Sequence, residues 1–336
     1  MTRIKENFPL KKHNTLGVDV KARFFASPQS IEEIIDLLEN SRELFPFLII
    51  GEGSNILFTG DYNGLVIKPA LKGINVINND HEHCYVEVGA GENWDEFVQW
   101  AVESNLAGIE NLSLIPGSAG SSPIQNIGAY GAEVSDAIEK VNYLDLESFE
   151  IKSLSAADCL FDYRKSIFKT QLRNRVVITS VIFRLNHNHI FNTTYGNLQT
   201  EVEKTGSLSL AAVRQAVINI RNSKLPDPKI TGNAGSFFKN PVVGKEVADQ
   251  IKENNPLMPY YTLPLDMVKI PAAWLIEQCG WKGRKIGNAG VHEKQALVLV
   301  NLGNATGVEI RDLAERIRDS VYKKFSVRLE PEVNII

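Results

Sequence analysis

The sequence predicts a protein of the α+β class, built from three consecutive parts that each mix helices with strands. Residues 94–103 have the apolar spacing of one buried helix face, and residues 47–50 form the short apolar run of a buried strand. The two prolines of KLPDP, at residues 224–228, end a helix and provide a hinge. We therefore expect domains over residues 1–70, 71–223 and 224–336.

In the first part, Ser27 followed by Pro28 has the pattern of a helix N-cap and first turn, and apolar residues then recur at helical spacing. The strand expected at residues 47–50 runs into a small-residue turn, GEGSN, at residues 51–55. A second strand is expected at residues 64–68. These elements predict a small α/β unit.

The second part begins with two short strand patterns and continues with the helix at residues 94–103, whose inward face carries Phe97, Val98 and Ala101. Strands are expected at residues 73–77, 85–88, 141–146 and 176–185, and a further helix at residues 211–222.

In the third part, Thr306 and Glu309 have the spacing of a capping box and predict the start of a helix. Its inner face carries Ile310, Leu313, Ile317 and Val321. A strand over residues 327–336 is expected to follow.

Composition excludes several classes of protein. The 36 Lys and Arg against 40 Asp and Glu give a net charge of −4, so no basic surface indicates nucleic-acid binding. The apolar runs are too short to span a membrane and the N-terminal segment has no apolar signal core, so we expect a cytoplasmic protein. Cys84, Cys159 and Cys279 are far apart and odd in number, which favours reduced buried thiols.

Residues 115–133, IPGSAGSSPIQNIGAYGAE, contain four glycines, three serines and three alanines, and their only charged side chain is Glu133. Such a backbone lets a ligand approach closely, and N–H groups of glycine and serine can hold phosphate without a lysine. Polar side chains such as Gln125 and Asn126 suit a polar heterocycle better than a metal ion. The segment is a candidate cofactor bed, and a tight structural loop is the alternative. Neither it nor GEGSN has the GxGxxG spacing of a Rossmann unit.

Three further positions are candidates for chemistry. Ser236 lies in NAGSFFKNP without the GxSxG frame of a hydrolase, so it is a turn residue or a general acid rather than a nucleophile. Arg164, between aromatic residues, can clamp a carboxylate or phosphate, or be an ordinary surface arginine. Glu330 and Glu332 flank Pro331 and can share one face of a strand or be solvated edge charges.

Two His-x-His pairs, at residues 81–83 and 187–189, have a spacing that places both imidazoles on one side of a strand. Neither pair has a third ligand nearby in the sequence, so we expect no metal site.

Seven motifs in order along the chain resemble the UDP-N-acetylenolpyruvoylglucosamine reductase family. They are GEGSN at residue 51, the whole of residues 115–133, YRKSIFK at 163, RNSKLPDP at 221, NAGSFFKNP at 233, HEKQALVLVN at 292 and LEPEV at 329. The segment TTYGNL, with Tyr195, resembles the family variant that carries an extra tyrosine loop over the substrate.

The resemblance implies an FAD-binding region in two parts, of the PCMH type, followed by a C-terminal α/β substrate-binding domain. It implies reduction of the enolpyruvyl ether of UDP-N-acetylglucosamine enolpyruvate to UDP-N-acetylmuramate, a peptidoglycan precursor. FAD is the implied cofactor and NADPH the implied reductant, which leaves before the sugar nucleotide binds.

The resemblance also implies roles for individual residues. The catalytic residues are Arg164, Ser236 and Glu332, and the substrate contacts are Tyr195, Lys224, Asn240, Lys282 and Gln295. The implied FAD contacts are Gly51, Glu52, Gly53, Ser54, Asn55, Pro116, Gly117, Ser118, Gly120, Ser121, Ser122, Gln125, Asn126, Ile127 and Gly128.

Residue chemistry is consistent with these roles. Hydride addition to the enolpyruvyl group drives charge into its carboxylate, which the permanent cation of Arg164 can stabilise. Ser236 can then supply a proton if a cation such as Lys239 or Lys224 favours its alkoxide. Glu332 can orient the enolate or assist proton delivery. The sequence departs from the family at Asn334, where a basic residue is frequent.

Two other functions stay open on the sequence. One is an FAD-dependent oxidase of another substrate on a similar fold. The other is a nucleotide-sugar binding protein without catalysis, although binding alone does not require Arg164, Ser236 and Glu332 together.

Overall fold

The computed structural model of the protein describes residues 3–41 and 46–336, which separate into two compact units. The first unit contains the described residues of Met1–Phe8, Ala22–Glu52 and Asn63–Ser223. The second contains Pro9–Lys21, Gly53–Tyr62 and Lys224–Ile336. The later boundary coincides with the one expected after residue 223, whereas two short N-terminal segments lie with the C-terminal residues. The division into three domains stays a prediction.

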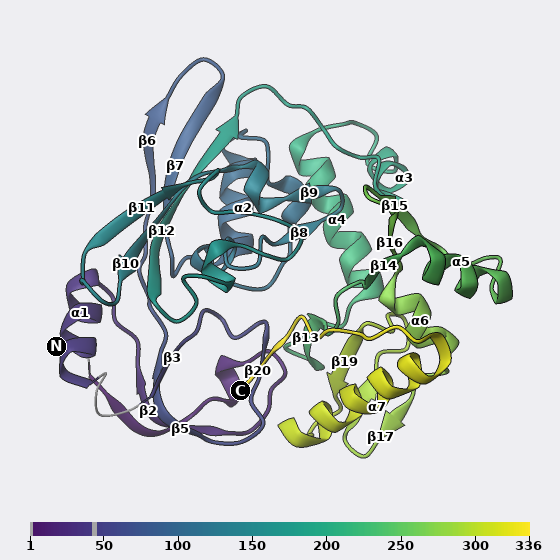
Figure 1. Ribbon diagram of the computed structural model, residues 1–336. Helices are drawn as coiled ribbons and strands as arrows, with labels where there is room; N and C mark the ends of the chain where they lie inside the picture. The colour runs from purple at the N-terminus through teal and green to yellow at the C-terminus, as the bar shows by residue number, and fades with distance from the viewer. Residues whose placement is uncertain (1–2, 42–45) are drawn as a thin grey trace. The chain divides into compact units, whose positions relative to one another are not determined.

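The first unit contains a four-stranded sheet in the order β1-β2-β5-β3, in which β3 and β5 run parallel. Helix α1 packs on it, because Ile34, Leu37 and Leu38 join Leu65 and Ile67 in one apolar cluster (Figure 1). The elements of this part are β1 (Lys5–Pro9), β2 (Lys21–Ala26), α1 (Ile31–Ser41), β3 (Phe47–Ile49) and β5 (Tyr62–Ile67).

The start of α1 differs from the sequence prediction. Ser30, not Ser27, is the capping residue, because the Ser30 hydroxyl accepts a hydrogen bond from the Glu33 N–H at 3.2 Å. The Ser27 hydroxyl instead donates to the carbonyl of Lys68, 2.9 Å away. Ser27 therefore ties the chain to the neighbouring segment, a tertiary contact that local pattern does not reveal.

The larger sheet of the first unit has five strands in the order β11-β10-β12-β7-β6, paired antiparallel. Helix α2 covers it with the fully buried side chains of Phe97, Val98 and Ala101, as the sequence predicts (Figure 1). The elements here are β6 (Ile74–Asn79), β7 (His83–Gly89), α2 (Trp94–Glu103), η2 (Glu110–Leu112), η3 (Ala119–Ser121), β8 (Gly128–Ala129), β9 (Ala132–Glu133), η4 (Val134–Asp136), β10 (Ile138–Asp145), β11 (Ile151–Ser155), η5 (Ile167–Lys169), β12 (Val176–Asn186), α3 (Leu198–Glu203) and α4 (Leu210–Lys224).

The second unit has a four-stranded sheet, β13-β19-β18-β17, and a three-stranded sheet, β14-β16-β15. Helix α7 begins with the predicted capping box of Thr306 and Glu309 and buries its predicted face. The elements are η1 (Lys11–His13), β4 (Ile56–Leu57), β13 (Gly232–Ser236), β14 (Val242–Gly244), α5 (Lys245–Asn254), β15 (Tyr261–Leu263), β16 (Met267–Lys269), α6 (Ala272–Gln278), β17 (Lys285–Ile286), β18 (Ala289–Val291), β19 (Val298–Asn301), α7 (Gly307–Phe325) and β20 (Asn334–Ile335).

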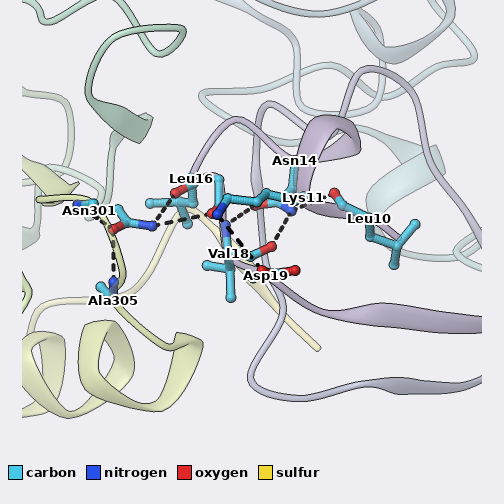
Figure 2. A network of polar contacts seen from close by, with 10 residues as sticks. Leu10, Lys11, Asn14, Leu16, Val18, Asp19, Asn301 and Ala305 are labelled. Atoms are coloured by element: carbon cyan, nitrogen blue, oxygen red, sulfur yellow. Dashed lines mark hydrogen bonds and ion pairs between the residues drawn. The ribbon is translucent and has the colours of Figure 1, made fainter. Parts of the chain in front are cut away.

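A buried amide joins the N-terminal segment of this unit to its C-terminal part (Figure 2). The Asn301 side chain donates to the carbonyl of Leu16 at 2.9 Å and accepts from the N–H groups of Gly303 and Ala305. Nearby, the Asn14 amide closes its own turn by bonding Val18. The segment Pro9–Lys21 is therefore an integral part of the second unit.

The continuous strand expected over residues 327–336 is wrong. Regular pairing is confined to β20, which lies parallel to β4, and Pro331 makes only an isolated bridge with Phe238. Proline has no N–H to donate to a ladder, so it interrupts the strand at this point.

Two other features concern the whole described chain. Cys84 and Cys159 are free and buried as expected, and Cys279 is free and half-buried. Among residues 3–41 and 46–336, no helix has the length and apolar character needed to cross a membrane.

Candidate active site

Within the first unit, the end of strand β3 lies directly against the glycine- and serine-rich segment 115–133. The Ile50 N–H still donates to the Ile67 carbonyl, and the chain then turns at Gly51. A Cβ on Gly51 would lie 2.8 Å from the Ser118 hydroxyl oxygen, closer than real Cβ atoms come. Two segments that are separate in the sequence thus meet at Gly51, where a larger residue would have to displace the Ser118 hydroxyl.

The GEGSN turn continues into the second unit. Glu52 forms an ion pair with Lys68 at 2.9 Å. Gly53 has a φ of +66°, and a Cβ there would lie 2.1 Å from the His13 carbonyl oxygen. Gly53 must therefore be glycine for two reasons, its backbone conformation and its close packing against His13.

The turn at residues 118–121 is held by its own serines. The Ser118 N–H donates to the Ser121 hydroxyl at 3.0 Å, and that hydroxyl donates to the Ser118 carbonyl at 2.7 Å. Gly120 packs so tightly that an added Cβ would lie 2.4 Å from the Ala90 Cβ. Residues 118–121 therefore form a tightly packed, hydrogen-bonded turn of small residues, called the shelf below.

We expected the N–H groups of this turn to be available to phosphate, but they already have acceptors within the protein. Those of residues 118–122 all donate inside the protein; Gly120, for example, donates to the Ala90 carbonyl at 3.0 Å. The 3-10 turn η3 uses these donors, and the Ser122 hydroxyl also donates to a backbone carbonyl, that of Ala119, at 2.7 Å.

The amides further along the segment have different surroundings. Asn126 is fully buried; its side chain donates to Glu133 at 2.8 Å and accepts from the Ser135 N–H at 3.1 Å. Gln125 is half-buried and accepts from Lys169 at 3.3 Å. The Asn126 amide thus braces the loop, a structural task that the sequence did not reveal.

Arg164 is docked onto the same segment. Its guanidinium donates to the carbonyl oxygens of Asn126 at 3.3 Å and Gly128 at 2.8 Å. The adjacent Ser166 hydroxyl donates to the Ile124 carbonyl at 2.6 Å. Arg164 has a φ of +54°, which non-glycine residues rarely adopt, so the surrounding contacts hold it in a strained turn. The structure thus brings Arg164 onto the candidate cofactor segment, a contact that the sequence did not predict.

In the second unit, Ser236 lies at the exposed end of β13, beside a bulge in the pairing with β19. Gly235 has a φ of +68° and donates its N–H to the Asn233 side chain, which turns the chain at this point. The next two side chains, Phe237 and Phe238, are each 1% exposed. A buried aromatic anchor therefore holds a serine whose own side chain is exposed.

Glu332 lies on the segment next to Ser236. Its N–H donates to the Phe237 carbonyl at 2.8 Å, and its carbonyl accepts from the Asn55 side chain at 3.2 Å. The two predicted catalytic residues of this unit are thus held on neighbouring backbone segments. The Asn334 side chain, which replaces a frequent basic residue, donates to the Asn55 carbonyl at 3.1 Å.

Glu330 has a different environment from Glu332. It is an exposed carboxylate that pairs with Lys239 at 3.3 Å. This ion pair partly neutralises Lys239, one of the two cations that the sequence offered to Ser236.

The predicted substrate contacts lie in both units. Tyr195 belongs to the first unit; the residue is 53% exposed, and its ring meets the Tyr130 ring edge-on, with centroids 6.2 Å apart. Lys224 is the last residue of α4 and the first of the second unit.

The other three substrate candidates belong to the second unit and also have local tasks. Asn240 accepts from the Ala272 N–H at the start of α6. Lys282 pairs with Glu277 at 2.9 Å, and the Gln295 side chain accepts from the backbone two residues later.

Sequence reasoning missed Tyr130 and Arg221. Burial raises the pKa of the Tyr130 hydroxyl, which hydrogen-bonds with the Arg221 guanidinium, and burial lowers the pKa of Arg221. The signal that could have found Tyr130 is an aromatic residue within a segment of small residues. Arg221 opens the RNSKLPDP motif but was not singled out.

Two family models match the chain. An FAD binding domain matches residues 22–148, and the C-terminal domain of UDP-N-acetylenolpyruvoylglucosamine reductase matches residues 227–336. The reductase of that name from Flavobacterium johnsoniae is 46% identical over 336 residues, covering 99% of both chains. The one from Bacteroides fragilis is 45% identical over 333 residues, covering 99% of this chain and 100% of its own.

The chain belongs to the UDP-N-acetylenolpyruvoylglucosamine reductase family. It is a flavoprotein oxidoreductase with FAD as its cofactor. The crystal structure of the Thermus caldophilus reductase covers 100% of this chain with a TM-score of 0.71 at 23% identity, which shows a shared fold. The expected α+β fold, an FAD-binding region followed by the family's C-terminal domain, is confirmed.

The described residues fit an FAD group. Where the turn at Gly51 meets residues 118–121, its nearest neighbours are the side-chain atoms of Ser118 and Ser121, so small polar groups border this position, as suits a polar ligand. Two charged candidate residues belong to these segments or contact them. Arg164 donates a hydrogen bond to the Gly128 carbonyl, and Glu52 forms an ion pair with Lys68.

Proposed function

We propose that this protein reduces UDP-N-acetylglucosamine enolpyruvate to UDP-N-acetylmuramate with electrons from NADPH, in peptidoglycan precursor synthesis. The observation that carries the proposal is the arrangement of Ser236 and Glu332. They lie on adjoining segments, joined by the hydrogen bond from the Glu332 N–H to the Phe237 carbonyl. Phe237 and Phe238, each 1% exposed, fix the backbone that carries the exposed Ser236 beside the segment of Glu332.

The reaction adds a hydride and a proton across a carbon–carbon double bond. FAD, held by the GEGSN turn and the residues of segment 115–133, would supply a hydride to the terminal enolpyruvyl carbon, with NADPH as the source of the electrons. The electron pair of the double bond then moves toward the adjacent carbon and its carboxylate. A proton must reach that adjacent carbon to complete the lactyl ether.

Arg164 is the residue proposed to stabilise the carboxylate as its charge increases. The hydrogen bonds from its guanidinium to the carbonyls of Asn126 and Gly128 fix the orientation of this planar donor before substrate arrives. A fixed donor requires no reorganisation during the reaction, which is why it lowers the barrier more than a mobile one.

Ser236 is proposed to give its hydroxyl proton to the adjacent carbon. The bulge at Gly235 and the anchors at Phe237 and Phe238 fix the position of the hydroxyl. Because Lys239 is paired with Glu330, Lys224 is the cation proposed to favour the resulting alkoxide. Glu332 orients the enolate or assists proton delivery.

Two sets of binding residues complete the proposal. The residues proposed to hold FAD are GEGSN and Pro116, Gly117, Ser118, Gly120, Ser121, Ser122, Gln125, Asn126, Ile127 and Gly128. The sugar nucleotide contacts Tyr195, Lys224, Asn240, Lys282 and Gln295.

The experiment follows the colour of the purified protein without oxygen. We expect a yellow protein that NADPH bleaches and that the enolpyruvyl sugar nucleotide restores to yellow. A bleached protein that air reoxidises but the sugar nucleotide does not would favour an oxidase of another substrate. A protein that binds the sugar nucleotide without reoxidation would favour a binding function instead.

A further inference from the structure

An ion pair between Asp95 and Arg214 joins two helices of the first unit. Asp95 lies in the first turn of α2, and Arg214 lies on α4. The guanidinium nitrogens Nη1 and Nη2 donate to the two carboxylate oxygens, at 2.6 Å and 3.0 Å. The Asp95 side chain is 26% exposed and that of Arg214 is 11% exposed, so solvent screens this pair less than a surface pair. A bidentate contact of this kind fixes the carboxylate in one orientation.

The fixed carboxylate of Asp95 also holds the turn that leads into segment 115–133. Its Oδ1 atom accepts the N–H of Leu114 at 2.5 Å. Leu114 has a φ of +59°, a left-handed conformation that a leucine adopts only where its surroundings impose it. A charge-assisted hydrogen bond is stronger than a neutral one, so the bond to Asp95 helps to offset the cost of this conformation.

The first turn of α2 also holds the chain on both sides of Leu114. The Trp94 indole N–H donates to the Leu112 carbonyl at 2.9 Å, and the Trp94 backbone N–H donates to the Gly117 carbonyl at 3.0 Å. Residues 113–116 therefore lie between two fixed points at the start of α2. The bond to the carboxylate fixes the strained residue of this stretch.

We propose that Arg214 is a positioning residue for FAD. It acts through Asp95, whose fixed carboxylate holds Leu114 and thereby places the residues that follow. The inference rests on the proposed function, in which residues 116–118 contact FAD. A segment that is already held in its binding conformation loses less chain freedom when the ligand binds, which is the benefit of preorganisation. Neither member of the ion pair lies in the seven motifs of the sequence.

Arg214→Met tests this role, because methionine keeps an unbranched stem on α4 and has no donor for the carboxylate. Without the guanidinium, the Asp95 side chain can turn away from Leu114. The matched control is Gln215→Met at the next residue of the helix, which is exposed and whose amide donates to Asn219 of the same helix. Arg214→Lys is a second variant, which keeps the positive charge and is therefore expected to fold even if Arg214→Met does not.

The first readout follows the turn itself in the holoenzyme. Hydrogen–deuterium exchange of the Leu114 amide is expected to accelerate roughly 10-fold in Arg214→Met, less in Arg214→Lys, and not at all in Gln215→Met. Unchanged exchange in the Arg214 variants that fold would overturn the tie to Leu114, whatever substrate the protein reduces.

The second readout is the release of FAD from diluted holoenzyme, measured by the rise in flavin fluorescence. Release is expected to be roughly 5- to 20-fold faster in Arg214→Met. Arg214→Lys should lie between this variant and the wild type, because an ammonium lacks the planar fork that meets both oxygens. Urea unfolding of the same proteins separates positioning from a purely structural role, which would lower the free energy of unfolding and leave FAD release unchanged.

The outcomes distinguish this inference from the proposed function. Faster Leu114 exchange with unchanged FAD release in Arg214→Met would overturn the positioning role. Unchanged release in Gly120→Ala as well would overturn the proposed FAD contacts on which that role rests. A wild-type protein that holds FAD but does not reduce the enolpyruvyl sugar nucleotide would overturn the proposed reaction and leave both readouts of Arg214 unaffected.

Discussion

Arg164 of the first unit and Ser236 of the second, two of the three predicted catalytic residues, are held in opposite ways. Arg164 lies in a strained turn, and its own functional group is fixed by hydrogen bonds to the carbonyls of Asn126 and Gly128. Ser236 has an exposed side chain, and its position is fixed instead by its neighbours Phe237 and Phe238 and by strand pairing.

The difference teaches where a substitution acts. Replacing Ser236 removes a hydroxyl and leaves its anchors intact, so the effect is confined to chemistry. Replacing Arg164 removes a charge and also two hydrogen bonds to the segment proposed to carry FAD, so its effect spreads to that segment. Comparing the two half-reactions separates these consequences.

The largest effect is expected for Ser236→Ala. Loss of a positioned proton donor slows reoxidation by the sugar nucleotide by about 10² to 10⁴-fold, while reduction by NADPH stays near the wild-type rate. Stopped-flow absorbance measures both steps, and Ser207→Ala, at an exposed serine of the other unit, is the control. Equal slowing of both steps would mean that Ser236 shapes the pocket rather than donating a proton.

Arg164→Ala is expected to slow reoxidation by about 10² to 10³-fold, or roughly 3 to 4 kcal/mol, by analogy with a lost oxyanion donor. Arg164→Lys should recover only part of this rate, because an ammonium lacks the planar fork that reaches two carbonyls. The same stopped-flow assay applies, with Arg173→Ala as the control at an exposed arginine. A rate close to wild type in Arg164→Ala would contradict the proposed role.

Asn301→Ala probes how the second unit is assembled. Removing this amide leaves the Leu16 carbonyl and the N–H groups of Gly303 and Ala305 without their partner, which should lower the free energy of unfolding by about 2 to 4 kcal/mol. Urea unfolding measures the change, and Asn304→Ala at an exposed position should stay within about 0.5 kcal/mol. If both variants had similar free energies of unfolding, the Asn301 amide would not be essential for holding the N-terminal segment.

The smallest effect is expected for Gly120→Ala. Its new Cβ would press on Ala90, so the shelf must shift, at a cost of about 1 to 3 kcal/mol in stability and with weaker FAD binding. Gly60→Ala is the matched control, since a Cβ at Gly60 has no neighbour within 4 Å. Thermal unfolding and flavin titration measure both variants; unchanged FAD affinity in Gly120→Ala would count against a rigid shelf.

Local signals in the sequence predicted much of the fold correctly. The periodicity of residues 94–103 gave α2, and the Thr306–Glu309 spacing gave the start of α7. Both depend on contacts within a few residues, which pattern reasoning captures. It failed at Ser27, whose hydroxyl bonds a distant carbonyl, and at residues 327–336, where Pro331 limits pairing to β20.

The candidate site likewise has features that the sequence predicted and features that only the structure revealed. Motifs named its residues, but no pattern indicated that the N–H groups of residues 118–122 are already used or that Asn126 is a buried brace. Hydrogen-bond partners separated by tens of residues leave no periodic trace, so these assignments required the structure.

By itself, the sequence determined the family and which residue types are available for catalysis, because those depend on composition and motif order. Only the tertiary structure decided how each is held: Arg164 by loop carbonyls, Ser236 by buried neighbours, and the segment Pro9–Lys21 by the Asn301 amide. The reason is that burial and hydrogen-bond satisfaction are set by groups brought together from distant parts of the chain.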